Sequence, residues 1–209
     1  MMQNKYLFGI TGGSGSGKST VSEIMRSLGY DIIDCDKVAR AVVEKGMPCL
    51  KEIEENFGAS VIDKSGALNR KKLGEIVFGD SENLQLLNSI THKYIVDEVF
   101  RLANESPCDS VGIDGAVLFE SGIGDKLRKV IAVVSDAELR IERISKRDGI
   151  DYERAKERIA AQARDSVIIE KCDWVIYNNQ SEQELVKSVK EVVLKLERDI
   201  KEEKERTEQ

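Results

Sequence analysis

The segment GGSGSGKST at residues 12–20 constrains this chain more than any other feature. It matches the spacing G-x-x-x-x-G-K-[ST] in full, at Gly12, Gly17, Lys18 and Ser19. An apolar run typical of a buried strand, residues 6–10, precedes it, and a helical pattern follows it. Glycines let the backbone turn tightly, so that successive N–H groups point at an anion, and the helix N-terminus adds its positive end. The segment therefore predicts a phosphate-binding loop between a strand and a helix.

We expect this loop to bind the phosphates of ATP together with Mg²⁺. Lys18 would bridge the β- and γ-phosphates, and the Ser19 hydroxyl would ligate Mg²⁺. The loop residues expected to contact the nucleotide are Gly13, Gly15, Ser16, Gly17, Lys18, Ser19 and Thr20. A glycine-rich turn with an incidental Lys-Ser is the alternative, which the agreement of motif, strand and helix disfavours. The glycines at 13, 15 and 17 do not meet the dinucleotide fingerprint G-x-G-x-x-G, so NAD binding is disfavoured.

Short apolar segments alternate with helical patterns along the chain. The patterns predict strands over residues 6–10, 30–33, 111–113, 130–134 and 174–177. Such alternation is typical of an α/β fold with a parallel sheet, here a three-layer P-loop fold.

Capping signals predict where several helices begin and end. Pro48 can open a helix that Gly58 stops. Ser135 and Glu138 have the spacing of a capping box, which predicts a helix that starts near Asp136.

The remaining helices lie in the last third of the chain. Asp151 is expected to cap a helix that runs towards Arg164. The final helix has an apolar face up to Leu196, and the sequence KEEKERTEQ beyond Ile200 is expected to be a solvated end that frays.

A long helical section, residues 50–103, separates the second expected strand from the third. It is too long for a plain crossover, so we interpret it as an insertion that covers the carboxyl edge of the sheet. The length of 209 residues fits one domain with insertions. The expected boundaries are a core of residues 1–35, 108–140 and 170–200, a substrate insertion of residues 36–107 and a lid of residues 141–168.

Charge and cysteine content exclude other classes of protein. The formal net charge of −6 argues against a dominant nucleic-acid surface. The four cysteines form no C-x-x-C pair and the chain has one histidine, which argues against a zinc site. There is no signal-peptide pattern and no apolar stretch near the ~18 residues that span a bilayer. We therefore expect a cytoplasmic protein with no nucleic-acid or membrane partner.

Two carboxylates leave the second expected strand in the sequence IDCD, at Asp34 and Asp36. If the backbone stays extended, both project on the same side, beside the expected γ-phosphate. One of them could accept a proton from an acceptor hydroxyl and orient that oxygen for in-line attack. Capping of the next helix is the alternative for each, and it is the interpretation that we favour for Asp34.

Three arginines share one expected helix face, because Arg140, Arg143 and Arg147 are spaced by three and four. Further basic residues follow at Arg154, Arg158 and Arg164. Phosphoryl transfer needs positive charge around the migrating group, so we interpret this stretch as a lid. The alternative is a solvated charged face, because acidic residues lie among the arginines.

Asp114 and His92 are weaker candidates. Asp114 ends the third expected strand, which suits either a carboxylate that holds Mg²⁺ through water or a turn cap. His92 lies on the long helix, where it would contact a substrate or be structural.

Eight segments follow one another between residues 9 and 179: GITGGSGSGKSTV, LGYDIIDCDKVAR, GALNRKKLGEIVF, LNSITHKYI, DGAVLFESG, RISKRDG, RIAAQ and DWVIYNN. This ordered set resembles the dephospho-coenzyme A kinase family, and the similarity covers nearly the whole chain, about residues 6–197. It departs from the usual pattern of that family at Lys93, Ala116 and Gln180.

The resemblance implies transfer of the γ-phosphoryl group of ATP to the ribose 3′-hydroxyl of dephospho-CoA, which gives CoA and ADP. Asp36 would be the general base. Lys18 and Arg143 would stabilise the transferring phosphoryl group, with Arg147 in support. The fold would resemble a nucleoside-monophosphate kinase, with a helical CoA domain and a small lid.

The resemblance also implies further contacts with the two substrates. On the dephospho-CoA side they are Arg40, Arg70 and His92. Near the adenine of ATP they are Asn178 and Asn179.

Two other functions stay open at this point. Another small-molecule P-loop kinase, acting on a nucleoside, nucleotide or shikimate-like alcohol, would use the same loop. A nucleotide-dependent switch would need a residue that orients water and loops that order around the γ-phosphate. The guanine-reading sequence Asn-Lys-x-Asp does not occur where such a switch would need it.

Overall fold

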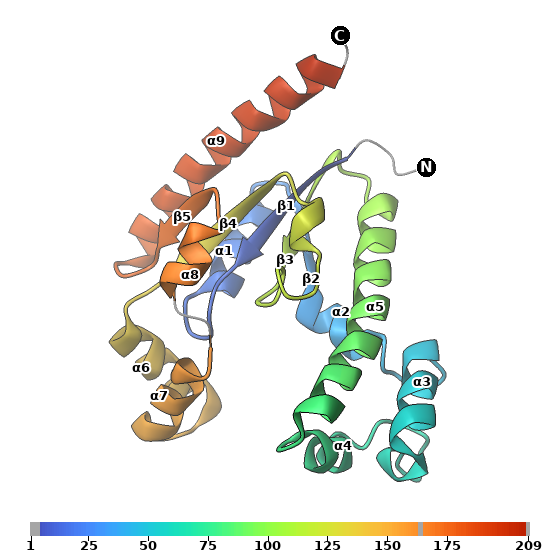
Figure 1. The fold of residues 1–209 in the computed structure, drawn as a ribbon. Coiled ribbons are helices and arrows are strands. Elements are labelled where there is room, and N and C mark those ends of the chain that lie inside the picture. Colours follow the sequence, from blue (N-terminus) through green and yellow to red (C-terminus); the bar gives the residue numbers. More distant parts are fainter. Residues whose placement is uncertain (1–4, 163–164, 208–209) are drawn as a thin grey trace. The chain divides into compact units, whose positions relative to one another are not determined.

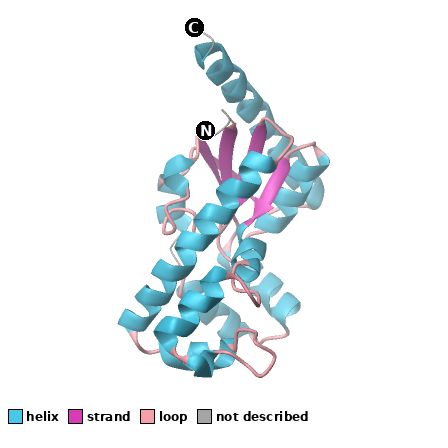
Figure 2. Ribbon diagram, turned by 90° about the vertical axis from the view of Figure 1, so that its right-hand side faces the viewer, coloured by secondary structure: helices cyan, strands magenta, loops and turns pink. Residues whose placement is uncertain are grey.

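The computed structural model describes residues 5–162 and 165–207, and within these ranges five strands form one sheet. Their order across the sheet is β2-β3-β1-β4-β5, with β1 pairing parallel to both β3 and β4, and β4 parallel to β5. The strands are β1 (Tyr6–Thr11), β2 (Asp31–Asp34), β3 (Ser110–Asp114), β4 (Lys129–Val134) and β5 (Trp174–Tyr177). Figure 2 shows the strands side by side. The predicted α/β fold is confirmed.

The chain divides into two compact units. The first unit, residues 1–33 and 106–209, contains the sheet with α1 (Lys18–Ser27), α6 (Ala137–Asp148), α7 (Tyr152–Ala160), α8 (Asp165–Glu170) and α9 (Glu182–Thr207) (Figure 1). The second unit, Asp34–Glu105, contains α2 (Cys35–Ala41), α3 (Pro48–Phe57), α4 (Arg70–Val77) and α5 (Ser81–Glu105). Short 3-10 turns lie at Ala59–Val61 and Gly124–Lys126.

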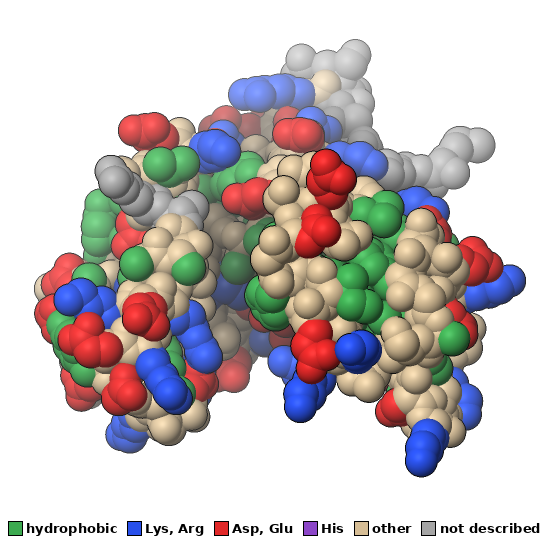
Figure 3. Space-filling view, turned by 60° about the horizontal axis from the view of Figure 1, so that its bottom comes forward, with side chains coloured by type: hydrophobic (Ala, Val, Ile, Leu, Met, Phe, Trp, Pro, Cys, Tyr) green, Lys and Arg blue, Asp and Glu red, His purple; other side chains and the backbone are tan. Residues whose placement is uncertain are grey.

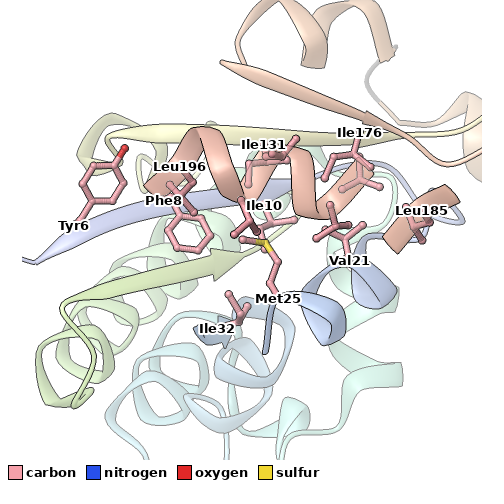
Figure 4. Packing of buried hydrophobic residues seen from close by; sticks show 14 residues of the cluster. Tyr6, Phe8, Ile10, Val21, Met25, Ile32, Ile131, Ile176, Leu185 and Leu196 are labelled. Carbon is pink, nitrogen blue, oxygen red and sulfur yellow. The ribbon is translucent and has the colours of Figure 1, made fainter. Parts of the chain in front are cut away.

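One face of the sheet is covered by α1 and α9, and the side chains between them form the main core of the first unit. Phe8 and Ile10 of β1 are fully buried, as are Met25 of α1 and Leu196 of α9. Figure 4 shows these side chains converging from the strands and the two helices. Burial of this apolar surface fixes α1, and with it the loop that joins β1 to α1.

Most of the local helix signals are confirmed. Pro48 occupies the first turn of α3, and Gly58, which follows the helix, has φ +85°. Only glycine adopts such a φ without strain, so the helix ends there. The Asp151 carboxylate caps α7, where it accepts the backbone N–H of Arg154 at 2.9 Å.

The predicted capping box at Ser135 is wrong. The helix α6 starts at Ala137 as expected, but its N-cap is Asp136, which makes no side-chain capping bond. The Ser135 hydroxyl is used elsewhere, because it donates to the backbone carbonyl of Asn178 at 2.8 Å. The partner of Ser135 therefore lies on another element of the fold, where no local spacing rule could place it.

Two expectations for the later helices also need correction. The helix predicted to run towards Arg164 ends at Ala160, and the short helix α8 was not expected. Arg164 itself lies outside the described residues.

The final helix does not fray beyond Ile200 as predicted but continues to Thr207. Its 26 residues make it about 39 Å long, roughly twice the length of β1. It passes the amino-terminal edge of the sheet, as both views of the fold show (Figures 1 and 2). Ion pairs hold it there, since Glu203 pairs with Arg128 at 3.0 Å and Lys204 with Asp109 at 2.8 Å.

No helix in the described ranges has both the length and the apolar content that crossing a bilayer would need.

Replacing Leu196 with alanine should lower the free energy of unfolding by about 2–5 kcal/mol, because the side chain is fully buried between α9 and the sheet. The matched control is Leu194→Ala on the same helix, where the side chain is 57% exposed. We expect that control to change the free energy by no more than about 0.5 kcal/mol. Urea unfolding of both variants measures this difference, and equal effects would contradict the packing of Leu196 against the sheet.

Candidate active site

The phosphate-binding loop joins the carboxyl end of β1 to the start of α1. Gly15 and Gly17 have φ +76° and +91°, and Gly17 is the N-cap of α1. The first turn of that helix has no acidic residue and its N-cap provides no side-chain acceptor. The N-terminal N–H groups of α1 therefore remain available to an anion, which the positive end of the helix dipole also favours.

Three successive carbonyl groups of the loop accept hydrogen bonds from side chains of other elements. The Ser14 carbonyl accepts from Arg140 Nε at 2.9 Å. The Gly15 carbonyl accepts from Arg143 Nη1 at 3.2 Å. The Ser16 carbonyl accepts from Asn178 Nδ2 at 2.9 Å.

These bonds orient the peptide groups of the loop. In a trans peptide the carbonyl of one residue and the N–H of the next point in opposite directions. Fixing the carbonyls of Ser14 and Ser16 therefore directs the N–H group of Gly15 away from Arg140 and that of Gly17 away from Asn178. The loop is thus preorganised for an anion by side chains that lie more than 100 residues away in sequence.

Lys18 forms an ion pair with Asp114 at the end of β3. The Asp114 side chain is nearly buried, and its second carboxylate oxygen accepts a hydrogen bond from Ser22 Oγ at 2.7 Å. The carboxylate thus holds the ammonium group of Lys18 beside the loop.

Ser19 and Asp114 are the residues that could contact a metal ion here. Both offer oxygen atoms, the ligands that Mg²⁺ prefers, and Ser19 is exposed in the first turn of α1. Among the residues described, no group of three or more His, Cys, Asp or Glu side chains could hold a metal by itself. This donor set fits Mg²⁺, which usually keeps several waters and binds through one or two protein groups plus substrate phosphates.

The three arginines of α6 have different environments. Arg140 is buried and Arg143 half-buried, and both donate to the phosphate loop. Arg143 also donates to Ser135 Oγ and to the Asn178 carbonyl, each at 3.1 Å. Arg147 is exposed and bonds its neighbour Asp148, on a surface of α6 and α7 where acidic and basic side chains mix (Figure 3). The structure thus places Arg143 at the loop and gives Arg147 no contact with it.

The two asparagines after β5 also differ from each other. The Asn178 amide supports the loop so closely that a Cβ atom on Gly17 would lie 2.0 Å from its Nδ2. Asn179 instead exchanges hydrogen bonds with Asp136, both at 2.8 Å. Contact of either asparagine with adenine stays a prediction.

The expectation that Asp34 and Asp36 both project from extended backbone is wrong, because α2 begins at Cys35. Asp34 is the N-cap of this helix, and its carboxylate accepts the N–H groups of Asp36 at 2.9 Å and Lys37 at 3.1 Å. The capping interpretation of Asp34 is therefore confirmed. Asp36 lies in the first turn of α2 with an exposed side chain.

The other expected substrate contacts belong to the second unit. Arg40 is exposed in the last turn of α2, Arg70 is exposed at the start of α4, and His92 is half-buried on α5. Their binding roles stay predictions.

The helix that carries His92 is fixed to α3 by its next two residues. Lys93 and Tyr94 both donate to the Glu52 carboxylate, at 2.9 and 2.5 Å. The hydrogen bond from Tyr94, and after it the one from Lys93, hold the pKa of Glu52 below its usual range. The ion pair is solvent-exposed, so its main effect is to set the orientation of α5 against α3.

The sequence patterns indicate no function for Ser22 and only a capping role for Ser135. Ser22 orients Asp114, and Ser135 accepts from Arg143. Ser22 is one helical turn after Ser19, a spacing that would have placed a polar side chain on the loop side of α1. No comparable signal identifies Ser135, because its partners lie on separate elements.

The sheet has five strands, and the phosphate loop follows the central one. A lysine and a serine stand in the first turn of the following helix, and an arginine from α6 donates to the same loop. Together these features define a P-loop kinase.

The family model for dephospho-CoA kinase matches residues 6–184 of the chain. A dephospho-CoA kinase of Fusobacterium nucleatum subsp. nucleatum is 40% identical over 184 residues, which cover 88% of this chain and 94% of that protein. The solved structure of TT1252 from Thermus thermophilus is similar, with a TM-score of 0.82 and 28% identity. A dephospho-CoA kinase from Campylobacter jejuni is similar with a TM-score of 0.67 and 29% identity. Each similarity covers 92% of this chain and 97% of the other one. The chain belongs to the dephospho-CoA kinase family.

Replacing Arg143 with lysine should weaken the binding of Mg·ATP by about tenfold or more. A lysine keeps the charge but cannot donate to Gly15, Ser135 and Asn178 at once, so the loop loses support. Titration calorimetry with Mg·ATP measures the affinity without any acceptor. Arg198→Lys, on the exposed surface of α9, is the matched control. If both variants bind Mg·ATP as the unmodified protein does, Arg143 does not support the loop.

Proposed function

We propose that this enzyme transfers the γ-phosphoryl group of ATP to the ribose 3′-hydroxyl of dephospho-CoA, giving CoA and ADP. Membership of the dephospho-CoA kinase family carries the choice of acceptor. The observation that carries the chemistry is the loop between β1 and α1, beside which both Lys18 and Arg143 lie: Lys18 is paired with Asp114, and Arg143 donates to the Gly15 carbonyl.

The loop residues bind the phosphates of ATP. The N–H groups of Gly15, Gly17 and the first turn of α1 contact phosphate oxygens. Lys18 exchanges the carboxylate of Asp114 for the β- and γ-phosphates, and Arg143 neutralises the charge that develops on the migrating group.

Mg²⁺ belongs to this proposal as the ion that neutralises phosphate charge when ATP is bound. The Ser19 hydroxyl would contact it, and Asp114 would hold its water ligands. Ser22 keeps the Asp114 carboxylate in place once Lys18 has moved to the phosphates.

Asp36 is the proposed general base. Its exposed carboxylate at the start of α2 accepts the proton of the ribose 3′-hydroxyl and orients the oxygen for attack on the γ-phosphorus. Arg40, Arg70 and His92, in the same unit of the chain, bind the phosphates and polar groups of dephospho-CoA.

An assay of ADP release tests the proposed acceptor. With Mg·ATP present, we expect ADP only when dephospho-CoA is added, with one CoA formed for each ADP. Shikimate and nucleosides serve as control acceptors of similar chemistry. ADP release with one of these controls, and none with dephospho-CoA, would refute the proposed substrate.

Replacing Asp36 with asparagine should reduce kcat by about 10²–10⁴-fold, because the proton acceptor is lost. The affinity for Mg·ATP should stay within about a factor of two, because Asp36 acts on the acceptor hydroxyl. Asp97→Asn, at an exposed position of α5 in the same unit, is the control for removal of one negative charge. Unchanged turnover in the Asp36 variant would exclude it as the base.

A further inference from the structure

We propose that Gln162 and Arg140 are positioning residues, which together clamp Ser14 and so couple the end of the α6–α7 hairpin to the shape of the phosphate loop. The proposal rests on the function above only in that this loop binds ATP. It extends the site to residues that contact the loop at Ser14.

Every polar atom of Ser14 is held by one of these two side chains. The Ser14 N–H donates to Gln162 Oε1 at 2.9 Å, and Gln162 Nε2 donates to Ser14 Oγ at 2.9 Å. The Ser14 carbonyl accepts from Arg140 Nε, also at 2.9 Å. A single loop residue thus has its donor, its acceptor and its hydroxyl fixed by α6 and by the segment after α7.

Arg140 links Gln162 to the loop. Its side chain is only 4% exposed, and Nη2 donates to the same Oε1 of Gln162 at 2.9 Å. Asp165, at the start of α8, compensates the buried charge through Nη1 at 2.9 Å. Each nitrogen of the guanidinium therefore has an acceptor, as a buried charge requires.

The fit between Arg140 and the loop is tight enough to restrict the sequence of the loop. A Cβ atom at Gly13 would lie 2.3 Å from Arg140 Nη2, and one at Gly15 would lie 2.7 Å from the Arg140 backbone oxygen. The contact with α6 thus requires both glycines, and at Gly15 the φ of +76° favours glycine as well.

The clamp gives the hairpin a mechanical connection to the loop. Ile144 of α6 and Ala155 of α7 are fully buried in one apolar cluster, which packs the two helices of the hairpin against each other. Gln162 is attached to the end of α7 by its own N–H, which donates to the Ile159 carbonyl at 3.0 Å. A displacement of α7 is therefore transmitted to Ser14, and through the Ser14 carbonyl to the direction of the Gly15 N–H.

The test is a comparison of phosphate-dependent and phosphate-independent binding. We expect Gln162→Ala to weaken Mg·ATP binding by about tenfold, because the Ser14 N–H and hydroxyl lose their partner and the loop loses its preorganisation. Binding of adenosine, which has no phosphate, should be unchanged. Ser14→Ala removes only the hydroxyl and keeps both backbone contacts. Its affinity for Mg·ATP should therefore fall less, by about threefold or less.

Glu157→Ala is the matched control, because this residue is exposed on α7. It should bind both probes as the unmodified protein does. The melting temperature of the ligand-free Gln162→Ala protein should stay close to that of the control. Equal losses for Mg·ATP and adenosine, or unchanged Mg·ATP binding, would overturn the positioning role.

The binding experiment separates this proposal from the proposed function. If the unmodified protein binds Mg·ATP but does not phosphorylate dephospho-CoA, the acceptor is wrong while the comparison of Gln162 variants still decides the clamp. If dephospho-CoA is phosphorylated and the Gln162 variant binds Mg·ATP normally, the clamp is wrong and the function stands.

Discussion

The active site of this kinase depends on the outward orientation of three loop carbonyls, at Ser14, Gly15 and Ser16. A glycine-rich loop is flexible, so fixing it costs conformational entropy. Here that cost is offset by donors from α6 and from the end of β5, before any nucleotide arrives. Because the loop is fixed in advance, the binding energy of ATP is not used to order it. The sheet and the helices α1 and α9 provide the rigid base on which those donors are placed.

The pair formed by Lys18 and Asp114 shows how charge is managed in the same site. Both side chains are largely shielded from water, so separating them without replacement would be costly. Phosphate offers Lys18 an equivalent partner, and Ser22 stays bound to Asp114. In the proposed function, nucleotide binding is thus an exchange of partners for Lys18, during which Asp114 keeps the hydrogen bond from Ser22.

The fold could be predicted from local signals, whereas much of the site could not. The strand, the loop motif and the helix after it are adjacent in sequence, and Pro48, Gly58 and Asp151 act within one helical turn. The capping rule gave a wrong prediction for Ser135, because the Ser135 hydroxyl donates to a residue 43 positions away. The contact between Ser14 and Gln162 spans 148 positions, and it depends on the packing of α6 against α7, which no spacing rule encodes. The extension of α9 was missed for the same reason, since its ion pairs join it to the starts of strands distant in sequence.

The path of α9 determines where a linker or a second protein can be joined to the enzyme without reaching the phosphate loop. The helix starts near the carboxyl ends of the strands, where the phosphate loop lies, and finishes beyond their amino ends. Tyr6 at the amino end of β1 bonds Asp199 on this helix, so the start of β1 and the last turns of α9 lie at the edge of the sheet away from the phosphate loop. A surface linker, a reporter domain or a solid support joined at the far end of α9 would lie at the edge of the sheet away from the phosphate loop. The same geometry would let the enzyme be fused to another enzyme without covering its own catalytic edge.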